Sequence, residues 1–449
     1  MMVQGKLPDN LVVVVDALDE CTDPHIVEIF LDLLFRSISY LPIKFYVASR
    51  PEPAIRNKMM SEREHTRSIL YLHEIEKSLV QADIKLYLKE ELEFMTPAEF
   101  EIKKLAEHAD NLFTYAETAV RYIGSKNRSM NSHARLSTIL AAYPESKNTL
   151  LSGLDVIYSA ILTAAIDDEE LIHQEQDEIR LVLWTAICAC EPILTSTLSA
   201  LCGLDEHTTM ATLESLRSIL HVSDRSTLVT TLHVSFPNYM FSLERSGVFF
   251  CDKVAHNQFL AQQCFDIMKS QLRFNIGDIK SSFIPDSEIP DLGESIVANI
   301  SDELFYACRF WADHLSRHPS SALLPEIYRF LSQLLLFWME VLCLKQVIHI
   351  GPNLLLKASR WVYSESHSSP ELASLLDDAH DFLKDFAFSP ASKSTPNIYV
   401  SSVRLCSKTS AIYACYSKCA QGWPDLDFCG RVTEYRTLAV SVVPNHNWM

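Results

Sequence analysis

The stretch from Leu11 to Glu20, LVVVVDALDE, constrains the fold more than any other part of the sequence. Five apolar residues run directly into Asp16, and two further carboxylates follow at Asp19 and Glu20. An unbroken, β-branched run of this kind is typical of a parallel strand that is covered on both faces. We therefore expect a buried strand over 11–18 whose carboxyl end carries three acidic side chains.

Strand-like and helical segments alternate after this run. The segment 24–41 has helical periodicity, and Pro24 suits its first turn. Two further apolar segments, 44–50 and 68–75, are interpreted as a second strand and a candidate third strand. Strands that alternate with helices in this way predict a parallel sheet, whose carboxyl ends form the ligand-binding edge.

The acidic cluster at the strand end suits a magnesium–nucleotide site. Mg²⁺ keeps several waters and usually takes one or two protein carboxylates together with phosphates. We expect Asp16 to bind the metal, and Asp19 or Glu20 to orient or deprotonate the attacking water. Arg50, at the end of the second strand, is placed to sense or neutralise a γ-phosphate. The structural alternative is that the strand simply ends in Asp16 and that Asp19 and Glu20 cap the next helix.

From about residue 77 the sequence is almost entirely helical in pattern. Glycine is scarce, with 10 residues in 449, and a chain poor in glycine favours helices over turn-dense β architecture. We expect a helical domain over 77–150, with a polar linker or boundary around 124–150. Together with a partial NTPase core over 1–76, this predicts a mainly α fold with a partial N-terminal α/β part.

The segment 151–245 predicts a winged helix. Three helical patterns precede two short strand-like pieces, 220–224 and 227–234, with Arg225 at the turn between them. The third helix carries a single basic residue, Arg217, so we interpret the unit as a packing module rather than a DNA reader.

Residues 246–449 predict an α-helical extension built from amphipathic helices. Its most apolar run begins at Phe330 and is interrupted by Gln333 and Glu340. The run is shorter than the ~20 apolar residues that a membrane span needs. We interpret it as a buried core helix.

Composition argues against several function classes. A net charge of −18 disfavours nucleic acid and anionic membranes as partners. Twelve cysteines without regular pairing, and no apolar leader at the N-terminus, indicate reduced thiols and a cytoplasmic protein.

The cysteines suggest no site of their own. Cys188 and Cys190 lie in an apolar helical pattern and are interpreted as core residues. Cys415, Cys419 and Cys429 lack the second close pair expected of a zinc site. No local signature indicates the Cys–His pair of a cysteine protease.

Several segments together resemble NACHT-type signal-transduction NTPases of the STAND class, above all the large fungal NACHT proteins that often carry WD40 repeats. LVVVVDALDEC resembles their Walker B motif, and KFYVASRPEPAIR resembles their sensor 1 strand. DNLFTYAETAVRYI resembles the helical domain, and LHVSFPNYM resembles the end of the winged helix. The helices FFCDKVAHNQFLAQQCFDIM and ELFYACRFWADHL resemble those that follow. The resemblance covers about residues 11–400.

The resemblance implies a role for five residues. Asp16 matches the acid that coordinates Mg²⁺, and Asp19 and Glu20 match the extended acidic pair, of which at least one is catalytic. Arg50 matches sensor 1, and His233 matches the winged-helix histidine that contacts the bound diphosphate in the closed state. The cofactors of intact relatives would be Mg²⁺ and ATP or ADP. The alternative for His233 is a hydrogen-bonded histidine on a half-buried strand.

A phosphate-binding loop of the form GxxxxGK[ST] does not occur in these 449 residues. The only Gly-Lys pair, Gly5-Lys6, is followed by Leu7 and directly precedes the first strand. No WD40 repeat pattern occurs either. We therefore expect weak ATP binding, negligible hydrolysis, and a chain that is truncated relative to intact NACHT proteins.

Two functions remain open at this point. The first is a truncated NACHT module, whose intact relatives use nucleotide exchange to open the domain stack and oligomerise. The second is a nucleotide-independent scaffold that binds a protein partner, a second copy or an intact relative, through its helical C-terminal half. A non-functional truncated product is a third hypothesis.

Overall fold

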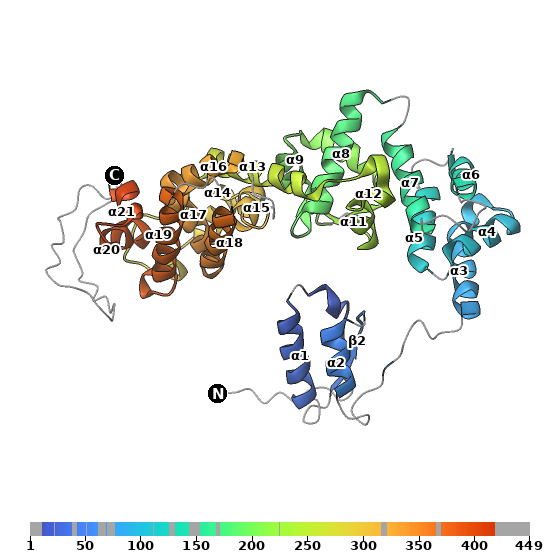
Figure 1. Ribbon diagram of the computed structural model, residues 1–449, viewed down its shortest axis with the longest axis horizontal. Coiled ribbons are helices and arrows are strands. Elements are labelled where there is room, and N and C mark those ends of the chain that lie inside the picture. The colour runs from blue at the N-terminus through green and yellow to red at the C-terminus, as the bar shows by residue number, and fades with distance from the viewer. Residues whose placement is uncertain are drawn as a thin grey trace. The chain divides into compact units, whose positions relative to one another are not determined.

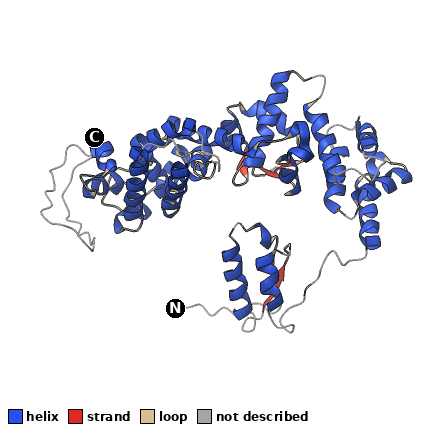
Figure 2. Cartoon of the chain, viewed as in Figure 1, coloured by secondary structure: helices blue, strands red, loops and turns tan. Residues whose placement is uncertain are grey.

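The computed structural model describes most of the chain. The described residues are 11–21, 23–37, 43–50, 52–61, 69, 77–110, 112–124, 131–142, 153–167, 171–223, 225–315, 321–364 and 370–417. The chain divides into two compact units, Met1–Val80 and Gln81–Met449. Helices dominate, and the described residues form two small sheets (Figure 2). The expected fold class, mainly α with a partial α/β part at the N-terminus, is confirmed.

The first unit contains a parallel strand pair joined by a helix. Strand β1 (Leu11–Val15) pairs in parallel with β2 (Ile43–Val47), and Leu11 lies opposite Ile43. The crossover contains helix α1 (Pro24–Ser37), and helix α2 (Pro53–Ser61) follows β2 (Figure 1). The predicted parallel pairing of the first two strands is therefore confirmed.

One face of this sheet lies open in the described part of the chain. The small core of the unit consists of Val27 and Leu31 of α1 and Ile55 of α2. Burial alternates along both strands, and Val12 and Val14 are 53% and 64% exposed. The expectation that β1 is covered on both faces was wrong for these residues. Valine suits a pleated strand even when only one face is packed, so the run alone could not distinguish the two cases.

Both strands end earlier than the sequence predicted, and the chain turns sharply after β1. Ala17 has φ 49° and ψ 48°, a left-handed conformation, and a 3₁₀ turn follows over Leu18–Glu20. The ladder nevertheless continues past β2, since the Leu18 amide donates to the Ala48 carbonyl at 3.1 Å. The candidate strand 68–75 lies, except for Ile69, outside the described residues.

The helices between the sheets include two that the sequence analysis did not predict, over 132–142 and 153–166. Their bounds are α3 Lys77–Glu91, α4 Glu99–Ala109, α5 Phe113–Ile123, α6 Ser132–Ala142 and α7 Gly153–Ile166. Helix α6 lies inside the segment that was predicted as a linker. It buries Leu136, Ile139 and Leu140 on one face, a spacing that its polar neighbours obscured.

Three helices and a three-stranded antiparallel sheet follow. Their bounds are α8 His173–Cys188, β3 Ile193–Leu194, α9 Thr195–Cys202, α10 Glu206–Ser215, β4 Leu220–Val222 and β5 Leu228–Thr231. The strand order is β3-β5-β4. The expected hairpin is β4–β5. Strand β3 was not predicted, because two residues are too short for any periodicity.

The described remainder, up to Tyr416, consists of helices and the loops that connect them. The principal helices are α11 Ser235–Met240, α12 Leu243–Ser246, α13 Lys253–Gln271, α14 Leu292–Asn299, α15 Asp302–Phe310, α16 Leu324–Arg329, α17 Leu335–Leu344, α18 Gly351–Ser364, α19 Pro370–Ala387, α20 Val403–Leu405 and α21 Ala411–Tyr416. Helices α13 and α15 pack against each other and against α9. The predicted domain boundary near residue 245 therefore falls within one packed unit, and the four-domain division stays a prediction.

One stretch, Leu324–Leu344, is long and apolar enough by length and composition to cross a membrane. However, 67% of its most apolar window is buried within the structure, as in the core helix of a globular unit. The stretch also buries the carboxylate of Glu340, which accepts from the Gly277 amide at 3.2 Å and the Tyr399 hydroxyl at 2.6 Å. The interpretation as a core helix agrees with this packing.

Candidate functional site

Asp19 and Arg50 meet at the carboxyl ends of the two parallel strands. The left-handed turn at Ala17 carries Asp19 over the end of β2. There its Oδ1 accepts from the Arg50 amide at 2.9 Å and from the Ser49 hydroxyl at 3.2 Å. The Arg50 Nε lies 3.6 Å from Asp19 Oδ2, and the Asp19 side chain is only 10% exposed. The two motifs that the sequence analysis paired are thus in direct contact.

The environment of Asp19 favours its charged form. Burial opposes ionisation, but the hydrogen bonds from Arg50 and Ser49 outweigh it and lower the pKa of Asp19. The Arg50 guanidinium acts in the same direction. Arg50 itself is 57% exposed, so its outer nitrogens stay accessible to solvent or to an anion.

The structure shows fewer contacts for Asp16 than for Asp19. Asp16 lies directly after β1 and is exposed, and its Oδ1 accepts from the Ala17 amide at 3.0 Å. Glu20 ends the 3₁₀ turn, and its side chain lies outside what the structure describes. Within the described residues no group of three or more His, Cys, Asp or Glu side chains is arranged to hold a metal. Mg²⁺ needs fewer protein ligands than that, so the metal role of Asp16 stays a prediction.

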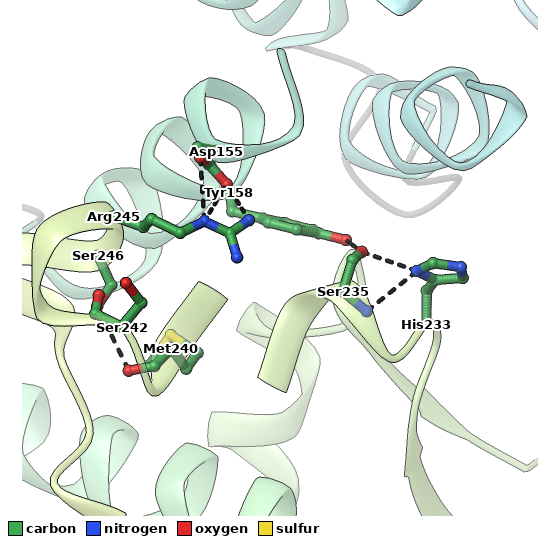
Figure 3. Close-up of polar contacts among 8 residues, drawn as sticks. All are labelled: Asp155, Tyr158, His233, Ser235, Met240, Ser242, Arg245 and Ser246. Carbon is green, nitrogen blue, oxygen red and sulfur yellow. Dashed lines mark hydrogen bonds and ion pairs between the residues drawn. The ribbon is translucent and has the colours of Figure 1, made fainter. Parts of the chain in front are cut away.

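His233 lies in the second unit, in the turn between β5 and α11. It therefore does not lie on a strand, as the alternative interpretation assumed, because β5 ends at Thr231. Its Nδ1 accepts from the Ser235 amide at 3.1 Å and lies 2.7 Å from the Ser235 hydroxyl (Figure 3). The hydrogen-bonded histidine of that interpretation is thus present, but the structure places it in a turn.

The His233 turn is connected to α7, which ends 67 residues before it. Tyr158 of α7 lies with its hydroxyl 2.8 Å from the Ser235 hydroxyl. The Tyr158 ring is buried and packs edge-on against Phe236, with 5.1 Å between the ring centroids. Figure 3 shows the three side chains in line, from Tyr158 through Ser235 to the imidazole of His233.

One helical turn before Tyr158, an ion pair holds α7 against α12. Arg245 of α12 contacts both carboxylate oxygens of Asp155 through Nε, at 3.1 and 3.2 Å, and also through Nη2 (Figure 3). The Asp155 side chain is 3% exposed, so the pair is shielded from water on the acidic side. Sequence reasoning missed both contacts, Tyr158 with Ser235 and Asp155 with Arg245. No local pattern links residues that lie 77 or 90 positions apart.

A Cys–His–Asn arrangement also occurs at the end of α8. The Cys190 Sγ lies 3.8 Å from His314 Nε2, and His314 Nδ1 lies 2.7 Å from Asn257 Oδ1. Cys188, the last residue of α8, is buried, and its assignment to the core is confirmed. Cys190 lies two residues beyond the helix and is exposed as a residue, so its assignment to the core was wrong, although its sulfur packs against His314 in a partly buried contact. The chemistry is nevertheless unsuited to nucleophilic catalysis. Desolvation raises the pKa of Cys190 to about 12 and lowers that of His314 to about 4, and the Tyr306 hydroxyl lies 2.9 Å from Nε2.

Comparison with known proteins gives one distant similarity. The chain is 23% identical over 373 residues to the vegetative incompatibility protein HET-E-1 of Podospora anserina. The similarity covers 76% of this chain and 26% of that protein, so the chain spans about a quarter of the relative's length. No protein-family model matches the chain.

Proposed function

We propose that this chain is part of a NACHT-type signal-transduction module. The observation that carries the proposal is the contact between Asp19 and Arg50, which joins the Walker B-like and sensor 1-like segments at one sheet edge. The distant similarity to HET-E-1 supports the same assignment over most of the chain. The order of elements from α8 to β5, three helices with a three-stranded antiparallel sheet, supports a winged helix in the middle.

In this proposal each of the three acidic residues has a different role. Asp16, which is exposed at the strand end, would hold a hydrated Mg²⁺ on the phosphates. Asp19 is occupied by Ser49 and Arg50, so it ties the arginine to the strand end and leaves water activation to Glu20. Arg50 would sense the γ-phosphate, and His233 would contact the diphosphate of bound ADP.

The 449 residues would bind ATP weakly and hydrolyse it negligibly, since they contain no GxxxxGK[ST] loop to cradle the phosphates. The test compares ATP turnover of the chain with that of Asp16→Ala, Glu20→Ala. Glu90→Ala, an exposed acid on α3, is the matched control. The proposal expects all three proteins to turn over ATP at the same background rate. A wild-type rate well above that of the double variant would contradict it.

The second candidate is a nucleotide-independent scaffold, and exposed apolar side chains favour it. Val248, Val297 and Phe388 of the second unit are 75–80% exposed. In this candidate such residues would contact a protein partner, a second copy or an intact relative, if they form a contiguous patch. The two candidates differ in one respect: Asp16→Ala should abolish signalling by a NACHT module and leave a scaffold unaffected.

A further inference from the structure

The apolar stretch Leu324–Leu344 contains one wide turn. Residues Phe330–Leu334, between α16 and α17, form a π-turn rather than an α-helical one. A π-turn joins backbone groups five residues apart, whereas an α-helix joins groups four residues apart, so this turn holds one residue more than a regular helix. Its last residue, Leu334, has φ −118°, far from the helical value of about −63°. Turns of this kind often lie at functional positions.

The hydroxyl of Tyr416 is inserted in this turn. It donates to the Leu331 carbonyl at 2.8 Å and accepts from the Leu335 amide at 3.0 Å. These two backbone groups lie four residues apart, so they are the acceptor and the donor of one ordinary α-helical hydrogen bond. A side chain that enters the hydrogen-bond ladder in this way distorts a helix. Tyr416 therefore keeps the turn open.

Tyr416 is the last residue of α21, which packs against α19 (Figure 1). The Asp378 carboxylate of α19 accepts from the Ser410 hydroxyl at 3.0 Å and from the Ala411 amide at 2.6 Å, where α21 begins. Ile412 of α21 is fully buried. A helix of six residues is not stable alone, so the helical form of α21 depends on these contacts.

Withdrawal of Tyr416 would leave two backbone groups facing each other in the core. Leu331 and Leu335 are both fully buried. A buried backbone group without a partner is strongly unfavourable. The Leu335 amide and the Leu331 carbonyl can satisfy each other, because they have the spacing of an α-helical bond. The turn therefore has a second arrangement that becomes favourable when the tyrosine leaves.

Phe330, the first residue of the turn, would report this change to the core. Its ring lies 5.4 Å from that of Trp338 and 5.0 Å from that of Trp311, between centroids. The Trp338 indole is held in place, since its Nε1 donates to the Cys308 carbonyl at 2.8 Å. Closing the turn by one residue rotates Phe330 about α17 by roughly 100°. Phe330 must then leave its present position between the two tryptophans.

We propose that α21 is a conformational latch. While α21 is docked, the Tyr416 hydroxyl holds the turn 330–334 in its open π form. When α21 is withdrawn, the Leu335 amide bonds to the Leu331 carbonyl, the turn closes, and Phe330 moves relative to the tryptophans. The latch thus couples the position of α21 to the core of the helical extension. It needs no nucleotide and does not rest on the proposed function.

The test is ¹⁹F NMR of the full chain labelled with 5-fluorotryptophan. The chain has six tryptophans, and the single substitutions Trp311→Phe and Trp338→Phe assign the two signals of interest. Trp184 of α8 packs against His256 rather than Phe330, so its signal is an internal reference.

Tyr416→Phe removes the inserted hydroxyl and keeps the ring. It should shift the signals of Trp311 and Trp338 and leave that of Trp184 unchanged. Tyr413→Phe is the matched control on α21, because the Tyr413 hydroxyl forms no hydrogen bond within the described part of the chain, and it should shift none of them. Unchanged Trp311 and Trp338 signals in Tyr416→Phe would overturn the proposal.

Deletion of Gln333, an exposed residue of the turn, separates the latch from simple packing. The deletion removes the extra residue, so the turn is already α-helical and Tyr416 no longer holds it open. Tyr416→Phe should therefore shift the tryptophan signals in the full-length turn and leave them in place in the shortened one. Equal shifts in both backgrounds would show that the tyrosine acts through packing alone.

Ile412→Asp withdraws α21 with Tyr416 intact, because it places a charge in the core. It should shift the Trp311 and Trp338 signals at least as far as Tyr416→Phe does, while hydrogen exchange of the segment 324–344 stays slow. Ala414→Asp adds the same charge to the exposed side of α21 and should change neither measurement. Fast exchange of 324–344 in Ile412→Asp, with the tryptophan signals at their denatured positions, would mean that the turn melts instead of closing and would contradict the proposal.

Discussion

Arg245 donates hydrogen bonds to the buried carboxylate of Asp155 and so joins α12 to α7. The two residues lie 90 positions apart in the sequence. The acid is almost fully shielded, while the arginine is 34% exposed. An ion pair of this kind is asymmetric, because removal of the arginine takes away the cation that neutralises a buried carboxylate.

Arg245→Met should therefore destabilise the second unit by about 3 kcal/mol, since the buried Asp155 carboxylate loses the guanidinium that neutralises it. The measurement is the free energy of unfolding in urea. Arg217→Met removes the exposed pair with Glu214, and this control should cost less than about 1 kcal/mol. Equal effects of the two changes would show that the Asp155 pair is no more important than a surface contact.

Asp19 predicts a dependence of local stability on pH. Its pKa is lowered from the ordinary value of 3.8, so its hydrogen bonds stabilise the folded state at neutral pH. This contribution should fade as the pH falls below about 4 and vanish below the folded-state pKa. Hydrogen exchange of the segment 43–50 should accordingly be slower in the wild type than in Asp19→Asn at neutral pH. The difference should disappear in acid, and a difference that is independent of pH would contradict the assignment.

Ala17 stores backbone strain at the turn that carries Asp19. Its φ of 49° lies in the left-handed region, which costs a residue with a Cβ roughly 1 kcal/mol relative to glycine. Ala17→Gly should thus be neutral or stabilise the first unit, whereas Ala17→Val should destabilise it. The first unit's thermal unfolding midpoint measures both. A glycine variant that unfolds earlier than the valine variant would mean that the turn is not left-handed.

Glu340 predicts the opposite pH dependence from Asp19. Burial raises its pKa above the ordinary value of 4.5, so the folded state favours the protonated acid. Its effect on stability is therefore most favourable in acid and falls as the pH rises through the raised pKa. Glu340→Gln should gain stability relative to the wild type between mildly acidic and neutral pH. Denaturant unfolding at several pH values measures this, and a constant difference would contradict the prediction.

The extent to which sequence anticipated the fold varies with the length of the pattern. The β-branched run before Asp16 and the helical periodicity after Pro24 were enough to predict a parallel strand pair. Strand β3 has only two residues, and the apolar face of α6 is surrounded by polar residues, so neither was recognisable. Helix α9 is one of the three helical patterns predicted before the hairpin, and it ends at Gly203, where a φ of 66° suits glycine.

The candidate site was anticipated only in its local parts. Asp16 and Arg50 were placed at one sheet edge because parallel strands end on the same side. The hydrogen bond from the Arg50 amide to Asp19 depends on the left-handed turn at Ala17. Alanine rarely adopts this backbone conformation, so the sequence did not predict the turn. Tyr158 could not be linked to Ser235 at all, because their contact exists only after α7 packs against α11.

The central proposal is that the acidic residues at the end of β1 respond to a magnesium nucleotide. Hydrogen exchange of the chain with and without millimolar Mg²⁺–ADP tests it most directly. The account predicts added protection in the segments 11–21 and 43–50 of the wild type, and none of it in Asp16→Ala. If wild type and Asp16→Ala exchange alike at every nucleotide concentration, the acids have no nucleotide role and the scaffold function is left.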